Sequence, residues 1–491
     1  MKFRNEAENR VSVDWDKNNL LRNYVFNIST QFISALISFL VIWSITRYAG
    51  TEVLAIVVAV TAGSQTILLF CNWTSIALLR LGTEEFIKTE KITYIYSARF
   101  ILFIFNVLVL ILLYPFWSSY LITILKLPSA ATPYLLVQFI IISILAHFTA
   151  GFQAVKLLRM QGILLVVEKS ISLIGIGLIY FFFTMNWENI IVAYLIASTV
   201  VVIASFFRLN KYYVFKAEKK YIRKVLLFSL PLLPYALTTF LTTNYLDAFF
   251  ISNYLEKNDL GVYSVAYQFY GFWMQLPTIL GGLMMPMFIS YIVKNHEHVL
   301  EKFLKESMHI ALLIWTFISS ILSFILCIII PQLFGIHHMQ LNSILTIFIL
   351  GTSFAFPNFI GFAPYTLAKK VVFFALPLAI VTAGFNFLGN YILIPKYGLV
   401  GSTYSSILSL LAGFSISYLF MSVYFKISVT RSLVSLLPAS LGILLCFWTS
   451  SLLIIMTCVL SGVIILLFIY RQNLMSVLEF IKKISKVSNR T

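Results

Sequence analysis

The stretch that decides the fold covers residues 23–70 and reads NYVFNISTQFISALISFLVIWSITRYAGTEVLAIVVAVTAGSQTILLF. Two long apolar runs are separated there by a short polar join, Arg47 to Glu52. Each run holds the roughly 20 mostly apolar residues that a helix needs to cross a bilayer, because unpaired backbone groups cannot be left in hydrocarbon. The pattern predicts two helices that cross the membrane in opposite directions.

The same pattern continues along the chain. Of 491 residues, 60% are apolar and 11% are charged, whereas a soluble domain carries about 25% charged residues. We predict an all-α polytopic membrane protein of about fourteen spans, at residues 23–46, 52–76, 95–118, 131–153, 161–184, 188–207, 226–254, 261–290, 307–330, 340–365, 371–394, 398–424, 432–449 and 451–470. The polar start shows no cleavable signal peptide, so the first run is expected to stay in the mature protein.

The basic residues predict the orientation. With the amino terminus in the cytoplasm, 30 of the 35 Lys and Arg residues fall in cytoplasmic segments, and the outer joins hold only Arg47, Lys126, Lys257 and Lys396. Cytoplasmic loops of membrane proteins carry such an excess, so we expect both termini in the cytoplasm. The net charge of +17 then reports topology and predicts no nucleic-acid partner, because the basic residues form no domain of their own.

Two classes of site have no sequence support. The four cysteines stand singly in apolar runs, without the spacing of a metal or redox site, and are expected to be packing residues: Cys71, Cys327, Cys446 and Cys458. No GxxxxGK[ST] phosphate loop is present, so an ATPase is not indicated. We expect no catalytic residue, metal or bound cofactor.

A basic polar stretch, Leu209 to Arg223, predicts a linker between two bundles. The expected division is a cytoplasmic segment 1–22, a first lobe 23–207 of six helices, a basic linker 208–225, a second lobe 226–424 of six helices, two further helices in 425–470, and a basic amphipathic cytoplasmic tail 471–491. A shift of 206 residues overlays Arg47-Tyr48 and Leu54-Ala55 on Asn253-Tyr254 and Leu260-Gly261. Parallel repeats with the substrate site between the halves are a common plan of transporters.

Two segments carry a family resemblance. The run LPLLPYALTTFLTTNYLDAFFISNYLEKNDLGVYSVAYQF, Leu230 to Phe269, resembles the opening of the second lobe in polysaccharide flippases of the Wzx kind, and NFLGNYILIPKYGLVGS, with Asn386 and Asn390, resembles their join between spans eleven and twelve. Arg47 and Ala55 in ITRYAGTEVLAIVVA also resemble the corresponding turn of the first lobe, although Ala55 stands where the family usually has glycine. The motifs resemble those of the multidrug, oligosaccharidyl-lipid and polysaccharide exporter superfamily, and they indicate the fold more than the substrate.

The resemblance implies a fold like that of multidrug exporters, with two six-helix lobes around a cavity that opens alternately to either side, plus two added helices. The implied substrate is an undecaprenyl-pyrophosphate-linked oligosaccharide, moved from the inner to the outer leaflet of a bacterial cytoplasmic membrane for surface polysaccharide such as O-antigen. A monomer in contact with membrane lipids and with polysaccharide polymerase machinery is expected. The transport is expected to be driven by the membrane potential or by a coupling ion, a proton or sodium.

Ionisable groups within spans are costly, so each is a functional candidate. Asp247, with Asn244 on the same helix face, is either a cation-binding carboxylate, a gate partner for a cation such as Arg47, or a hydrogen-bonded structural acid. Lys169, next to Glu168, either meets a pyrophosphate or extends back to the interface. A lone His147 is either a coupling residue or a packed side chain.

Other candidates lie at span ends and along span one. Arg47 and Arg80 suit phosphate oxygens because a guanidinium donates a fork of hydrogen bonds, although interface anchoring explains them equally well. Asn23, Asn27 and Gln31 recur at every fourth residue and mark a polar helix face, which lines a cavity or bonds between helices.

Two other functions would need different residues. A drug or cation antiporter of the same fold needs an exchanging carboxylate, and Glu168 and Asp247 are the only acids well inside predicted spans. A membrane glycosyltransferase or polymerase is disfavoured, because the outer joins are short and hold almost no charge.

Overall fold

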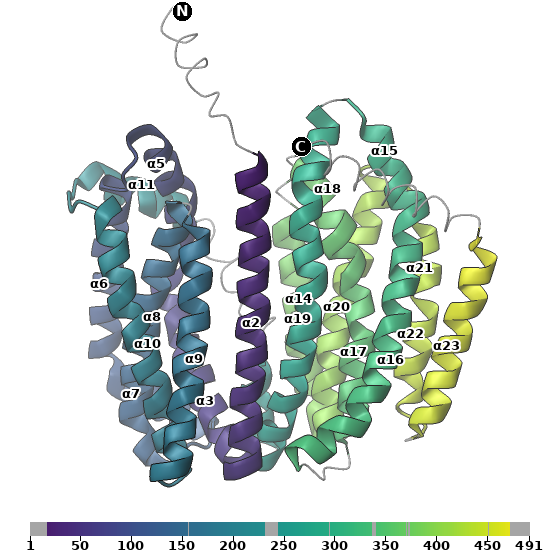
Figure 1. Ribbon diagram of the computed structural model, residues 1–491, viewed down its shortest axis with the longest axis horizontal. Helices are drawn as coiled ribbons and strands as arrows, with labels where there is room; N and C mark the ends of the chain where they lie inside the picture. Colours follow the sequence, from purple (N-terminus) through teal and green to yellow (C-terminus); the bar gives the residue numbers. More distant parts are fainter. Residues whose placement is uncertain are drawn as a thin grey trace, which may run out of the picture.

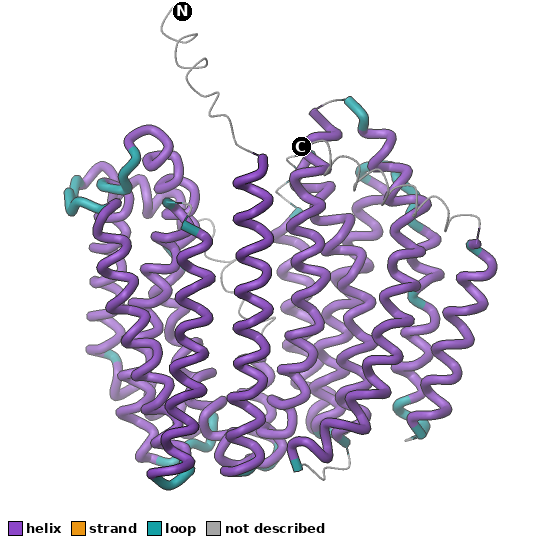
Figure 2. The backbone as a smooth tube through the Cα atoms, in the orientation of Figure 1, coloured by secondary structure: helices purple, strands orange, loops and turns teal. Residues whose placement is uncertain are grey.

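The computed structural model describes residues 17–155, 157–230, 244–293, 295–335, 340–369, 371, 374–449 and 451–471. Figure 2 shows that helices and the turns between them make up this part of the chain, with no strand among the described residues. The predicted amphipathic tail lies outside the described residues, apart from Arg471. The helices satisfy their own backbone groups, as hydrocarbon requires.

The first group of helices covers the amino-terminal part of the chain (Figure 1). It comprises α2 (Lys17–Ala49), α3 (Thr51–Asn72), α4 (Ser75–Ala77), η1 (Leu78–Gly82), α5 (Thr83–Thr89), α6 (Tyr94–Leu112), α7 (Tyr114–Ile124), η2 (Ser129–Ala131), α8 (Thr132–Ala154), α9 (Leu158–Phe182) and α10 (Trp187–Leu209). Helix α2 packs along α9, and α3, α8 and α10 pack against one another. We call this group the first bundle.

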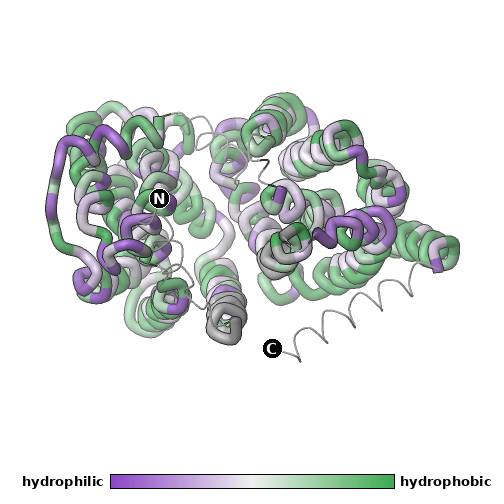
Figure 3. The backbone as a smooth tube through the Cα atoms, turned by 90° about the horizontal axis from the view of Figure 1, so that it is seen from above, coloured by the Kyte–Doolittle hydropathy of each residue, from purple (hydrophilic) through white to green (hydrophobic). Residues whose placement is uncertain are grey.

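The second group lies beside the first, as Figure 3 shows from above. It comprises α13 (Asn244–Tyr254), α14 (Lys257–Val293), α15 (Glu297–Lys302), η5 (Phe303–Ser307), α16 (Met308–Phe334), α17 (Leu341–Pro357), η6 (Asn358–Phe362), α18 (Ala363–Ala368), α19 (Ala375–Tyr397) and α20 (Leu399–Val423). We call it the second bundle. Helices α21 (Thr430–Ser435), α22 (Leu437–Leu445) and α23 (Leu452–Ile469) pack on its outer side, against α16 and α17.

The predicted fold class is confirmed. Eleven helices in the described part of the chain are long and apolar enough to cross a membrane. The three remaining predicted spans correspond to α13 with the residues before it, to the 37-residue α14, and to the shorter helices α21 and α22. The chain is therefore a multi-pass membrane protein.

The basic segment that follows α10 packs on the first bundle. It forms a short turn η3 (Asn210–Tyr212) and then α11 (Lys219–Ser229), whose Val225 is fully buried. The backbone N–H of Lys216 donates to Ser97 Oγ at 2.9 Å, and Tyr221 stacks on Tyr94 of α6. The segment is thus fixed against the beginning of α6.

Small residues bring α19 and α20 into close contact. A Cβ at Gly389 would meet the side chain of Ser405, and a Cβ at Gly401 would meet the carbonyl of Leu393. Glycine at such positions lets two helix backbones approach closely, which is how helices associate in membranes without a hydrophobic driving force. This close pairing brings the polar residues of both helices to one place in the second bundle.

Candidate functional site

Asp247 lies at the centre of a buried hydrogen-bond network in the second bundle. Its side chain is 1% exposed and accepts hydrogen bonds from Tyr263 Oη at 2.5 Å and from Asn390 Nδ2 at 2.6 Å. Asn386 Nδ2 and Ser406 Oγ donate to it at 3.3 Å each. Among the described residues no basic side chain forms an ion pair with this carboxylate. Neutral donors therefore compensate its charge.

Four helices contribute to this network, which explains why the sequence showed only part of it. Asp247 comes from α13, Tyr263 from α14, Asn386 and Asn390 from α19, and Ser406 from α20. The two asparagines lie in a segment that carries the family resemblance, but the sequence did not predict their contact with Asp247. Their spacing of four residues places them on one face of an otherwise apolar helix, and that was the available signal.

The network can bind a proton or a small cation. Asn390 Oδ1 is buried and has no hydrogen-bond partner, although the amide nitrogen of the same side chain donates to Asp247. Carboxylate, amide and hydroxyl oxygens are the ligands that hard cations take. A buried carboxylate inside a membrane protein also marks proton and ion pathways.

The two bundles meet at the end of the molecule away from the first turn of α2, at the bottom of Figure 1. There Trp43 Nε1 donates to the carbonyl oxygen of Leu333 at 2.9 Å. The guanidinium of Arg47 lies against Gly335, which ends α16 in a left-handed conformation. A cation at a helix carboxyl end is favourable, because the last carbonyl groups carry partial negative charge. Arg47 is thus part of the contact between the bundles.

A second contact at the same end joins the start of α3, and Lys126 after α7, to the residues where α13 passes into α14. The hydroxyl of Thr51 donates to Asn258 Oδ1, and Lys126 Nζ donates to the carbonyl oxygen of Leu255 at 3.4 Å. Gly261 packs so closely on Thr51 that a Cβ there would overlap the Thr51 carbonyl oxygen. The two turns that the 206-residue shift overlays therefore face each other.

The three hydrogen bonds just described join the first bundle to the second, and all three lie at this end. Aromatic contacts, such as Phe39 with Phe269 at 5.1 Å between ring centroids, continue along α2 and α14. These three hydrogen bonds must break for the bundles to separate at this end.

Arg99 is a buried cation that sequence reasoning missed. Its side chain is 0% exposed and lies on α6, five residues from the start of the helix. Nη1 bonds His147 Nδ1 at 2.6 Å and the His147 carbonyl oxygen at 3.2 Å, and Nη2 donates to Asn72 Oδ1 at 2.9 Å. No carboxylate in the described part of the chain pairs with it. His147, one of the predicted coupling residues, is thus a partner of this cation.

The other predicted residues lie apart from these clusters. Glu168 accepts a hydrogen bond from Ser198 at 2.9 Å, and Lys169 beside it is half-buried on α9. Arg80 is exposed and pairs with Glu84 at 3.7 Å. The half-buried Gln31 lies on α2, and the side chains of Asn23, Asn27 and Asn244 lie outside the described part. The predicted substrate residues whose side chains are described, Arg47, Arg80, Lys169 and Gln31, do not form one cluster.

Comparison with known proteins places the chain. The family of polysaccharide biosynthesis proteins matches residues 20–292, more than half of the sequence. The chain belongs to this family. A search of curated protein sequences finds no match.

Solved structures show the same fold. The chain is similar to the lipid II flippase MurJ in an inward closed conformation, with a TM-score of 0.67 and 18% identity over 92% of this chain and 99% of that one. It is also similar to the Vibrio cholerae MATE transporter VcmN in its bent form, with a TM-score of 0.53 and 13% identity over 85% and 98% of the two chains. The family match agrees with the resemblance to polysaccharide flippases that the sequence motifs carry, and the solved structures show that the fold is shared with a lipid II flippase and a MATE transporter.

Proposed function

We propose that this protein is a flippase that moves an undecaprenyl-pyrophosphate-linked oligosaccharide from the inner to the outer leaflet of the bacterial cytoplasmic membrane, for surface polysaccharide biosynthesis. The observation that carries the proposal is the arrangement of two bundles that are joined by three hydrogen bonds at one membrane face. The membership in a polysaccharide biosynthesis family and the fold shared with a lipid II flippase support it.

The cycle follows from this arrangement. With both termini in the cytoplasm, as the basic residues predict, the contact at Thr51 and Gly261 closes the outer face. The sugar and pyrophosphate enter between the bundles from the cytoplasm while the lipid tail stays in the bilayer. Rocking of one bundle against the other then breaks the outer contact and releases the head group, as in other transporters with repeated halves.

The membrane potential assists export of an anionic head group. A pyrophosphate diester carries about two negative charges, and each charge gains about 2.3 kcal/mol across 100 mV with the inside negative. Asp247 is proposed to couple a proton or a sodium ion to the same movement. Helix α13 supports this role, because it carries Asp247 near its start and Leu255 of the bundle contact directly after its end.

Arg47, Arg80 and Lys169 are proposed to meet the pyrophosphate, with the polar face of α2 beside them. Arg47 lies at the outer contact, where a leaving head group would pass, and Lys169 lies on α9, which packs along α2. Arginine suits this task because its planar fork binds two phosphate oxygens together.

A cell-based export assay tests the proposal. Lys169→Ala and Arg47→Ala are expected to abolish surface polysaccharide while membrane abundance stays normal. Arg47→Lys should restore part of the export, because it keeps the charge and loses the fork. Lys426→Ala, at an exposed loop residue, is the control and should be silent. Normal export by both alanine variants would contradict the cationic pathway.

A second function deserves a test because of the Asp247 network. A buried carboxylate with amide and hydroxyl neighbours is what a cation antiporter needs, and the V. cholerae transporter shares the fold. Cells that express the protein would then resist cationic drugs, and Asp247→Asn would remove the resistance. Unchanged drug susceptibility together with restored polysaccharide in a flippase-deficient strain favours the flippase.

A further inference from the structure

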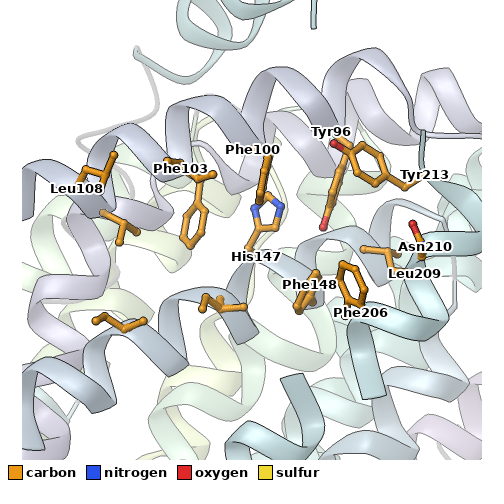
Figure 4. A pocket seen from close by; sticks show the side chains of 14 residues that line it. Tyr96, Phe100, Phe103, Leu108, His147, Phe148, Phe206, Leu209, Asn210 and Tyr213 are labelled. Atoms are coloured by element: carbon orange, nitrogen blue, oxygen red, sulfur yellow. The ribbon is translucent and has the colours of Figure 1, made fainter. Parts of the chain in front are cut away.

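An apolar groove runs along the first bundle between α6, α8 and α10. Its volume is about 360 Å³, which falls in the range of ligand pockets. Figure 4 shows Phe100 and Phe103 of α6 on one side and Phe148 and Phe206 on the other, with the ring of His147 between them. The walls are almost entirely hydrocarbon, and the groove is open along one side. A lipid chain fits such a lining, whereas a sugar or a phosphate does not.

The groove has the length of one leaflet. Its lining on α6 extends from Tyr96 to Leu108, which lie twelve positions apart and are therefore separated by about 18 Å of helix. Half of a bilayer's hydrocarbon core is about 15 Å thick. Leu108 is 55% exposed at the deep end, and Asn210 and Tyr213 lie at the other end, next to the basic segment. The groove therefore begins at the membrane surface and ends near the middle of the bilayer.

The mouth of the groove carries positive charge. Segment 208–224 holds seven basic residues and one acidic residue. Lys211 follows the lining residue Asn210, and Lys216 follows Phe215, whose ring contacts the lining residue Phe100. A hydrogen bond with the Tyr94 hydroxyl at 2.9 Å raises the pKa of Lys216, so its ammonium group stays charged at neutral pH. An anionic head group at this level is attracted.

The groove is separate from the contact between the bundles. Helices α6 and α10 lie on the side of the first bundle away from α14 to α23, as Figure 1 shows. The hydrogen bonds of Arg99 to His147 and Asn72 hold α6, α8 and α3 together behind the groove wall, so its shape is fixed by a buried network. A molecule bound there does not lie between the bundles, where cargo would pass.

We propose that this groove binds one acyl chain of an anionic phospholipid of the surrounding bilayer, with the phosphate held near Lys211 and Lys216. The lipid is a resident of the first bundle and is not the transported molecule. It anchors the basic segment, α6 and α10 in the leaflet on the side of the membrane where the basic segment lies.

Photo-crosslinking with purified full-length protein in phosphatidylcholine vesicles tests this assignment. A phosphatidylglycerol probe with a diazirine at the end of one acyl chain is expected to label peptides that contain residues 100–108 and 140–148. A phosphatidylcholine probe with the same chain should label them less. Equal labelling by the two probes would overturn the proposal, as would displacement of the phosphatidylglycerol probe by a polyprenyl phosphate at equal concentration.

Matched variants locate the chain and the head group. Ile144→Trp fills the groove and should remove the labelling, whereas Ile196→Trp, at a 55% exposed residue of α10 outside the lining, should not. Lys211→Gln and Lys216→Gln should each lower the preference for phosphatidylglycerol by about fivefold, with Lys426→Gln as the unaffected control. These lysine variants keep the groove intact, so they test the head group even if Ile144→Trp does not fold. Unchanged labelling in folded Ile144→Trp would contradict the proposal. An unchanged preference for phosphatidylglycerol in both Lys211→Gln and Lys216→Gln would also contradict it.

Discussion

In the part of the chain that the structure describes, each bundle buries one charged residue, and the two residues are compensated differently. In the second bundle Asp247 accepts hydrogen bonds from four side chains, two of them at 2.6 Å or less. In the first bundle Arg99 binds only a histidine and an asparagine, and its Nε has no hydrogen-bond partner. The Asp247 carboxylate has several oxygen-bearing neighbours, so it can bind a proton or a cation that neutralises its charge. The Arg99 guanidinium has two neutral partners and keeps its positive charge.

The largest expected effect is at Asp247. In Asp247→Ala, buried donors of Tyr263 and Asn390 lose their acceptor at about 1 to 3 kcal/mol each, so the free energy of unfolding should fall by several kcal/mol. Asp247→Asn keeps the volume and one acceptor oxygen, and should recover most of the stability without recovering transport. Thermal unfolding in detergent and export assays separate the two effects.

Full export by Asp247→Asn would show that the charge is not used. In that case the network around Asp247 is structural, and the comparison with Arg99 loses its functional meaning.

The second prediction separates the bundle contact from the network. Gly261→Ala places a methyl group on the Thr51 carbonyl oxygen, so closure of this end should become less favourable by about 1 to 3 kcal/mol, or roughly 5- to 150-fold. Export should fall while abundance and unfolding temperature stay near normal. Gly177→Ala, where a Cβ meets nothing within 4 Å, is the matched control. Equal export by the two variants would contradict a contact that must close in each cycle.

The third prediction concerns the cation of the first bundle. Arg99→Met removes a buried charge together with its desolvation cost, but leaves His147 and Asn72 without their partner. These terms oppose each other, so the net loss of stability should stay below about 2 kcal/mol. Differential scanning fluorimetry measures it. A larger loss than in Asp247→Ala would reverse the comparison between the bundles.

The smallest effect is expected from topology reporters, which leave both bundles unchanged. Both termini and residues 209–223 should be cytoplasmic, because these segments concentrate the basic residues. Phosphatase and fluorescent-protein fusions decide this. An external reading at any of the three positions would move the bundle contact to the cytoplasmic face.

The sequence predicted the helices well and the site only in part. A membrane span is a local property, since about 20 apolar residues suffice to specify it, so α3, α8 and α20 were predicted within a few residues. Asp247 was found because an acid in an apolar run is conspicuous. Its partner Asn390 is 143 residues away, and no local pattern joins the two.

Arg99 was missed for a related reason. It stands near the beginning of its apolar run, where a basic residue usually reaches the membrane surface, and it was therefore counted with the cytoplasmic residues. Its burial depends on the packing of α3, α6 and α8, which the sequence does not show. Arg47 was expected to face a substrate, and the structure adds its contact with the end of α16.

The central claim is that a lipid-linked oligosaccharide crosses the membrane through this protein, and transport in reconstituted vesicles tests it most directly. Purified protein is placed in vesicles that carry undecaprenyl-pyrophosphate-linked oligosaccharide, and an impermeant sugar-modifying enzyme reports how much reaches the outer leaflet. We expect the oligosaccharide to reach the outer leaflet faster than in protein-free vesicles, and faster still with an inside-negative potential. Gly261→Ala should slow this transport, whereas Gly177→Ala should not. A rate equal to that of protein-free vesicles at every potential would contradict the central claim.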